Sequence, residues 1–221
     1  LGITALVAGL IVGLAKLWDV IIDPVIGTLS DRLRARSGTR RQLMLVGALS
    51  LPLAFLSTFA VPAGITPVVA AVWVVIAFVL STTAFSLFQV PYIALPAELA
   101  GDYDGRTRLL TWRVIVLTIA ILLFGAGGPL LRGLGDDPRA GYLIMAAVAG
   151  TVIGAGLLVA ALTAPRGAAG IPQPRTSALA GYRLAVAALR ELPALRALLG
   201  AFVLQALATG VMLAAAQYVA T

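Results

Sequence analysis

Long apolar runs dominate this chain, and short polar stretches separate them. Each run holds about 20 or more residues, the length that an α-helix needs to cross the hydrocarbon core of a bilayer. The pattern predicts six membrane-spanning helices, at Ile3–Leu29, Gln42–Val61, Val68–Ala97, Leu110–Leu131, Tyr142–Thr163 and Leu195–Tyr218. The intervening connections are expected at Ser30–Arg41, Pro62–Pro67, Glu98–Leu109, Arg132–Gly141 and Ala164–Ala194. The sequence therefore predicts an all-α membrane protein.

Composition excludes several classes of function. Hydrophobic residues make up 61% of the chain and charged residues 11%, which rules out a soluble enzyme. The chain has no Cys and no His, so it lacks thiol chemistry, disulfides and histidine metal sites. We find no nucleophile–base pair or metal cluster of an enzyme, and we expect no cofactor and no nucleic-acid partner.

Basic residues alternate between the predicted connections. The first, third and fifth are rich in arginine, whereas the second has no charge and the fourth balances its two arginines with Asp136 and Asp137. Because cytoplasmic loops collect Lys and Arg, the odd connections are predicted to be cytoplasmic and both ends of this chain extracytoplasmic. The net charge of +7 is thus read as topology, in a multi-pass membrane protein whose expected location is a bacterial inner membrane.

Two carboxylates interrupt the first apolar run. Asp19 and Asp23 are four residues apart, so they lie on one helix face, and an ionised side chain at mid-membrane costs roughly 2.5–3.5 kcal/mol. Such a pair must face protein or water, and it is typical of a site for a coupling cation. An alternative is a structural ion pair between Lys16 and Asp19, which would leave only Asp23 free.

Two motifs carry a family resemblance. The sequence LWDVIIDPVIG at 17–27 runs into the basic stretch TLSDRLRARSGTRR, and VPYIALPAELAGDYDGRTRLLTWR follows at 90–113. Together they resemble the glycoside–pentoside–hexuronide:cation symporter family of the major facilitator superfamily. The resemblance implies a helix bundle in which this chain is a fragment, the second to the seventh of twelve helices. Residues 1–163 would be the N-terminal half without its first helix, 164–194 a cytoplasmic linker with an interfacial helix at 177–192, and 195–221 the first helix of the C-terminal half.

The same resemblance assigns roles to individual residues. It implies a cation site of Asp19, Asp23 and Ser86, in which the two carboxylates would be metal ligands if the ion is sodium. The coupling ion, H⁺ or Na⁺, stays open, because Ile22 replaces a polar side chain of melibiose-type members. The implied substrate contacts are Lys16, Trp18, Gln89 and Arg113.

Each substrate contact has a structural alternative. Gln89 and Arg113 could form interhelix bonds or anchor the cytoplasmic interface, and Trp18 could simply pack. Gln89 stands where melibiose-type members have an acid, and Ile93 where they have an aromatic residue, which puts galactoside recognition in doubt.

Glycines 125, 127 and 128 are expected to permit close helix contact.

A conformational latch is expected after the first helix. Gly27, Asp31, Arg32, Arg40 and Arg41 resemble the superfamily's cytoplasmic loop motif, in which Asp31 would bind a helix N-terminus or an arginine. The alternative explanation is that these arginines only set the membrane topology, by keeping this loop in the cytoplasm.

The predicted function is cation-coupled symport of a sugar or related solute by alternating access. Two alternatives remain open: a cation-coupled carrier for a lipid or other non-sugar solute, and a non-transporting membrane sensor or scaffold. The expected partners are a small solute, a monovalent cation and the lipid bilayer, with a monomer as the complete protein.

Overall fold

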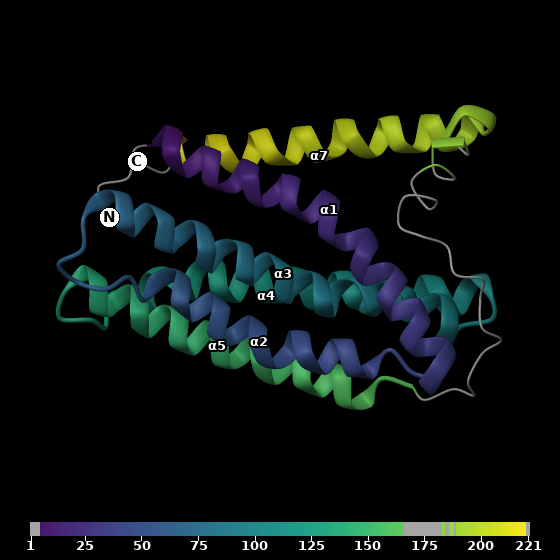
Figure 1. The fold of residues 1–221 in the computed structure, drawn as a ribbon, viewed down its shortest axis with the longest axis horizontal. Helices are drawn as coiled ribbons and strands as arrows, with labels where there is room; N and C mark the ends of the chain where they lie inside the picture. Colours follow the sequence, from purple (N-terminus) through teal and green to yellow (C-terminus); the bar gives the residue numbers. More distant parts are fainter. Residues whose placement is uncertain (1–4, 166–182, 184–185, 188, 220–221) are drawn as a thin grey trace. The chain divides into compact units, whose positions relative to one another are not determined.

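The computed structural model describes residues 5–165, 183, 186–187 and 189–219, and all the regular structure in these ranges is helical (Figure 1). This confirms the predicted all-α fold. The helices are α1 (Ala5–Ser37), α2 (Arg41–Phe59), α3 (Pro67–Leu99), α4 (Tyr103–Arg132), α5 (Pro138–Thr163) and α7 (Pro193–Val219). Each of the six predicted spans lies largely within one of them.

Three of the connections, the first, third and fourth, are shorter than predicted. The stretch Ser30–Arg41 was expected to be a loop, but α1 continues as a helix through Ser37, and α3 and α4 are separated only by residues 100–102. The arginines at 32, 34 and 36 therefore lie on helix. Long Arg side chains lose little freedom in a helix, and the turn is made where Gly38 adopts a φ of +70°, a conformation that glycine supplies at low cost.

Among the described residues, four helices are long and apolar enough to cross a membrane: α2, α3 to Pro96, α4 and α5. At a rise of about 1.5 Å per residue, the 33 residues of α1 measure about 50 Å, more than the roughly 30 Å of a hydrocarbon core. Its basic C-terminal turns are therefore expected to project beyond the membrane.

The chain divides into two compact units, Leu1–Pro174 and Arg175–Thr221. The first contains α1 to α5 and the second contains α7. Most of the predicted linker, including residues 177–182 of its expected interfacial helix, lies outside the described residues.

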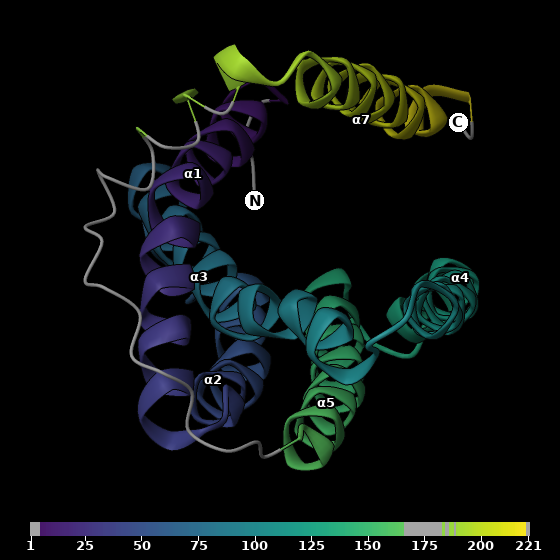
Figure 2. The same ribbon diagram turned by 90° about the vertical axis from the view of Figure 1, so that its right-hand side faces the viewer.

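Helix α2 packs against α3 and against α5, and these are the two most extensive helix contacts of the first unit (Figure 2). A Cβ added to Gly47 of α2 would lie 2.7 Å from the backbone nitrogen of Phe88, so glycine permits this close approach to α3. The apolar core gathers around the contact, with Met44, Ala48 and Phe88 almost completely buried. On the other side of α2, a Cβ added to Gly154 of α5 would lie 2.7 Å from the side chain of Pro52.

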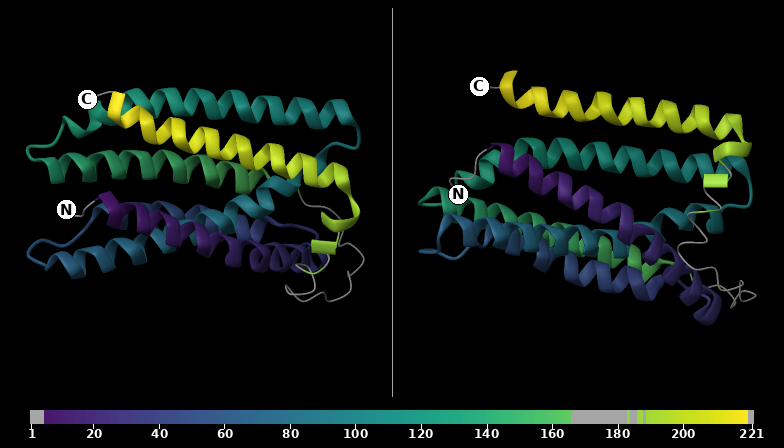
Figure 3. Two further views of the ribbon diagram at one scale, coloured as in Figure 1. Left: turned by 90° about the horizontal axis from the view of Figure 1, so that it is seen from above. Right: turned by 45° about the horizontal axis from the view of Figure 1, so that its top comes forward.

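Helix α4 runs beside α5 at the edge of the unit, with only a small contact to α3 (Figure 3). No residue of α4 is buried. Within the described residues a Cβ at Gly125 or Gly127 would meet nothing within 4 Å, and one at Gly128 would just reach Met145, so the close helix contact expected at the first two stays a prediction. Within the first unit, no helix covers the face on which those two glycines lie.

Candidate functional site

Asp19 and Asp23 belong to the packed face of α1. With about 100° of rotation per residue, these two acids fall with Ile26 and Ser30 inside an arc of about 60°. Ile26 is 3% exposed and Ser30 is fully buried, which marks this arc as the side of α1 that packs on the bundle. The two carboxylates therefore point toward protein, as the cost of exposing them to lipid requires.

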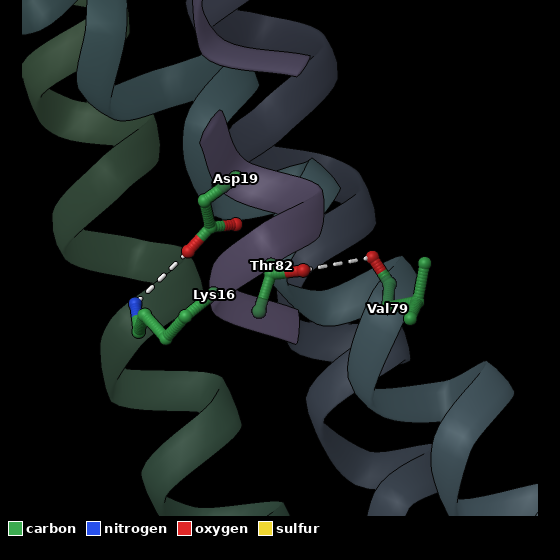
Figure 4. A network of polar contacts seen from close by, with 4 residues as sticks. All are labelled: Lys16, Asp19, Val79 and Thr82. Atoms are coloured by element: carbon green, nitrogen blue, oxygen red, sulfur yellow. Dashed lines mark hydrogen bonds and ion pairs between the residues drawn. The ribbon is translucent and has the colours of Figure 1, made fainter. Parts of the chain in front are cut away.

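Each of these carboxylates has one buried oxygen without a hydrogen-bond partner, Oδ1 of Asp19 and Oδ1 of Asp23. The second oxygen of Asp19, Oδ2, accepts a hydrogen bond from Nζ of Lys16 at 2.9 Å (Figure 4). Lys16 is largely exposed, at 72% of its side chain, against 19% for Asp19. The expected ion pair is present, yet it is not a buried one, and it satisfies only half of one carboxylate.

Helix α3 presents oxygen atoms to this face. Two contacts fix how the helices are aligned: the indole nitrogen of Trp18 donates to Oγ1 of Thr83 at 2.8 Å, and a Cβ on Gly27 would lie 3.8 Å from Val90. From the first contact to the second, the residue number rises on both helices, so α1 and α3 run parallel. Thr83, Ser86 and Val90 share an arc of about 60° on α3, which is the side that meets α1.

Interpolation between these contacts places Asp23 within about one turn of Ser86 along the helix axes, because Asp23 lies five residues after Trp18 and Ser86 lies three residues after Thr83. Ser86 is 4% exposed, which fits a hydroxyl enclosed between the two helices. The structure thus brings Asp19, Asp23 and Ser86 to one interface, and their role as cation ligands stays a prediction.

The chemistry of this interface suits a small monovalent cation or a proton. Its donors are carboxylate and hydroxyl oxygens, the ligand type that hard cations prefer. Among the described residues, no cluster of three or more His, Cys, Asp or Glu side chains could hold a metal ion. A site here would thus use two carboxylates and hydroxyl oxygens. Figure 4 also shows Thr82 of α3, whose hydroxyl donates to the carbonyl of Val79 at 3.1 Å.

Arg113 makes a cation–π contact with Tyr92. Its guanidinium lies 5.6 Å from the centre of the Tyr92 ring, and that ring stacks on Phe88 with centroids 5.4 Å apart. Through this stack Arg113 of α4 joins the buried core between α2 and α3. This contact fits the interhelix alternative for Arg113. Gln89, also on α3, is half-buried, and the substrate roles of both residues stay predictions.

The latch residues meet at the start of α2. Nη2 of Arg40 lies 2.7 Å from Oδ1 of Asp31, and Nη1 donates to Oγ of Ser30 at 2.6 Å. The Arg40 side chain is 11% exposed, whereas Asp31 is 66% exposed. The prediction that Asp31 binds an arginine is therefore confirmed, while its effect on conformational exchange stays a prediction. Gly27 contacts Val90, Arg32 is exposed, and the buried Nε of Arg41 has no hydrogen-bond partner.

Sequence reasoning missed three residues of this region: Thr83, Tyr92 as the ring beneath Arg113, and Ser30 as the second partner of Arg40. Thr83 belongs to a run of three hydroxyl residues, Ser81 to Thr83, inside an apolar helix. That run was the available signal, because hydroxyls within membrane helices commonly bond across to a neighbouring helix.

Comparison with known proteins decides the family. The model of the MFS/sugar transport protein family matches residues 1–221, the whole chain. The chain belongs to this family. The resemblance to glycoside–pentoside–hexuronide:cation symporters is thereby confirmed, and with it the helix bundle of the major facilitator superfamily.

Individual relatives agree with this membership. The chain is 35% identical over 140 residues to a protein of Synechocystis named an uncharacterized symporter, sll1374, with 58% of this chain and 26% of the relative covered. It is 28% identical over 143 residues to the putative glycoside/cation symporter YagG of Escherichia coli, covering 64% of this chain and 31% of that protein.

A third relative is the inner membrane symporter YicJ of Escherichia coli, 29% identical over 146 residues, 62% of this chain and 30% of the relative. The chain thus spans less than a third of the length of these curated relatives. With the four apolar helices, these matches confirm a multi-pass protein of a bacterial inner membrane. The family is one of transporters rather than enzymes.

Proposed function

We propose that this chain is part of a secondary active transporter that couples a monovalent cation to the movement of a sugar or related solute. The observation that carries the proposal is the pair of buried carboxylate oxygens, on Asp19 and Asp23, that have no hydrogen-bond partner. A buried charge without a partner is costly, so such a group gains by taking up a cation or a proton. Either event couples the protein to an ion gradient.

The proposed cation site consists of Asp19, Asp23 and Ser86, between α1 and α3. Asp23 is its indispensable member. Lys16 already neutralises part of Asp19, whereas among the basic side chains of α1 none lies within one turn of Asp23. Cation binding would favour the state whose cavity takes the solute, and rocking of the two halves would carry both across. The ion is H⁺ or Na⁺.

The proposed solute is a sugar. YagG is named a glycoside/cation symporter, and this supports the same solute class for a chain of the same family. Lys16, Trp18, Gln89 and Arg113 are the candidate contacts. The amide of Gln89 favours the alternative, a lipid or other non-sugar solute. A panel of radiolabelled sugars and non-sugar solutes, tested for displacement from the complete protein, separates these two solute classes.

Gradient-driven uptake tests the proposal. In vesicles that contain the complete protein, Asp23→Asn is expected to abolish accumulation under an imposed sodium or proton gradient while solute exchange at equilibrium continues. Asp104→Asn, which changes an exposed acid in the first turn of α4, is the matched control and is expected to accumulate solute normally. Undiminished accumulation by Asp23→Asn would show that the acidic pair is structural. A wild-type protein that binds solute without moving it would instead be a sensor.

A further inference from the structure

The side chain of Trp18 occupies the position beside Asp19 in the sequence, and it bridges to the neighbouring helix. Its indole nitrogen donates to Oγ1 of Thr83 at 2.8 Å, and Thr83 in turn donates its hydroxyl hydrogen to the carbonyl of Val79 at 2.7 Å. The Thr83 hydroxyl therefore both donates and accepts a hydrogen bond. It donates its single hydrogen to the Val79 carbonyl, and its oxygen accepts from the indole N–H.

This bridge stands out among the contacts between α1 and α3. The other described approach between these helices is that of Gly27 to Val90, where a Cβ would lie 3.8 Å from the valine side chain, and this apolar contact allows sliding at little cost. A hydrogen bond with a donor on one helix and an acceptor on the other is directional, and it weakens steeply when the atoms move apart. Trp18–Thr83 therefore sets the axial alignment of α1 against α3.

The acidic pair depends on that alignment. Any axial shift of Trp18 relative to Thr83 also shifts Asp23 relative to Ser86, because each pair lies on one helix and is only a few residues apart. A slip of one residue would shift Asp23 by about 1.5 Å along the axis. Ligand distances in cation sites must hold to within a few tenths of an ångström, so a shift of this size would break the ligand set.

We infer that Trp18 and Thr83 form a clamp that holds the cation site in register, and that Trp18 is a positioning residue for the ion. This inference rests on the proposed function, since it assigns a role within the same Asp19–Asp23 site. It gives Trp18 a different task from the sugar contact implied by family resemblance, because the only polar group of the indole is already bound to Thr83.

The test compares variants that remove one side of the clamp. Thr83→Val removes the acceptor with little change of shape, and Trp18→Phe removes the donor while keeping an aromatic ring. Each is expected to raise the sodium or proton concentration for half-maximal uptake roughly three- to tenfold, the effect of one lost hydrogen bond. The solute KM measured at saturating cation should change less than twofold.

Two further variants separate positioning from folding. Thr83→Ser keeps the hydroxyl and is expected to restore the cation dependence of the wild type. The double variant Trp18→Phe/Thr83→Val is expected to be no worse than either single variant, because both remove the same bond. Trp73→Phe is the matched control: its indole nitrogen donates to the Ser57 carbonyl at 2.9 Å, between α3 and α2, so its loss should leave the cation dependence unchanged.

Three results would overturn the inference. Wild-type cation dependence in both clamp variants, with accumulation abolished in Asp23→Asn, would refute the clamp and leave the proposed function intact. A raised solute KM in Trp18→Phe but not in Thr83→Val would return Trp18 to the solute site. Normal accumulation by Asp23→Asn would refute the proposed function, and this inference with it.

Discussion

Arg40 is bound to Asp31 across the turn that joins α1 to α2, with Nη2 2.7 Å from Oδ1. The same guanidinium reaches the buried hydroxyl of Ser30. The Arg40 side chain thus ties the start of α2 to the last packed turn of α1. If α1 moves along its axis, either these contacts break or the start of α2 moves with it.

Asp31→Asn should therefore change conformational exchange more than solute binding. We expect a several-fold slower net transport with solute affinity within a few-fold of the wild type, because Asp31 is remote from Asp19 and Asp23. Little loss of stability is expected, since an ion pair with a largely exposed carboxylate contributes about 0–1 kcal/mol. Transport rate and equilibrium solute binding measure the two effects, and Arg36→Gln on exposed helix is the control. A large loss of affinity at a normal exchange rate would contradict the latch.

Lys16→Gln should strengthen cation binding. Lys16 neutralises one oxygen of Asp19, so it competes with any ion that needs this carboxylate. Its removal is expected to lower the cation concentration for half-maximal uptake a few-fold, a small effect because Lys16 is mostly exposed to solvent. Cation-dependent uptake, with solute KM measured in parallel, checks this. A higher solute KM with unchanged cation dependence would instead assign Lys16 to the solute.

The ring of Tyr92 should contribute through its face rather than its hydroxyl. Tyr92→Phe keeps the ring beneath Arg113 and is expected to be near neutral, whereas Tyr92→Leu removes the cation–π contact. That contact is expected to contribute about 0.5–2 kcal/mol, depending on how dry the site is. Thermal unfolding in detergent and transport by both variants are the measurements. Equal loss in the two variants would show that the hydroxyl is what matters.

Gly47→Ala should destabilise the first unit. Its Cβ would lie 2.7 Å from the Phe88 nitrogen and 2.8 Å from the Ala84 oxygen, backbone atoms that cannot turn away. Such overpacking is expected to cost about 1–3 kcal/mol. Gly127→Ala is the control, because its Cβ meets nothing within 4 Å and alanine favours helix. The thermal unfolding midpoint is expected to fall for Gly47→Ala and to stay the same or rise for Gly127→Ala. An unchanged midpoint for Gly47→Ala would contradict the close approach of α2 to α3.

Membrane orientation can be tested by single-cysteine labelling, since the chain has no native cysteine. Arg36 and Ala63 are suitable positions because both are exposed. Their neighbours Thr39 and Gly64 are less suitable, because the Thr39 hydroxyl donates to the Pro165 carbonyl and the φ of +77° at Gly64 disfavours other residues. An impermeant reagent applied to intact cells is expected to label Ala63→Cys and not Arg36→Cys. The reverse pattern would invert the proposed topology.

Local chemistry was enough to predict the helices and the acidic pair. A run of about 20 apolar residues can satisfy its backbone in lipid only as a helix, whatever its neighbours are. Two acids four residues apart share a helix face by geometry alone. The boundaries failed because polar residues are equally compatible with a loop and with a helix that projects into water, as residues 30–37 show.

The contacts between helices were decided only in three dimensions. Glycines 47 and 125 read alike in sequence, yet one touches a neighbouring backbone and the other faces open space. Arg113 contacts Tyr92, and Trp18 donates a hydrogen bond to Thr83. These partners are too far apart in the sequence for a local pattern to predict the contacts. Hydrophobic burial is non-directional, so an apolar sequence fixes which segments enter the membrane, whereas close packing and directional hydrogen bonds fix which faces meet.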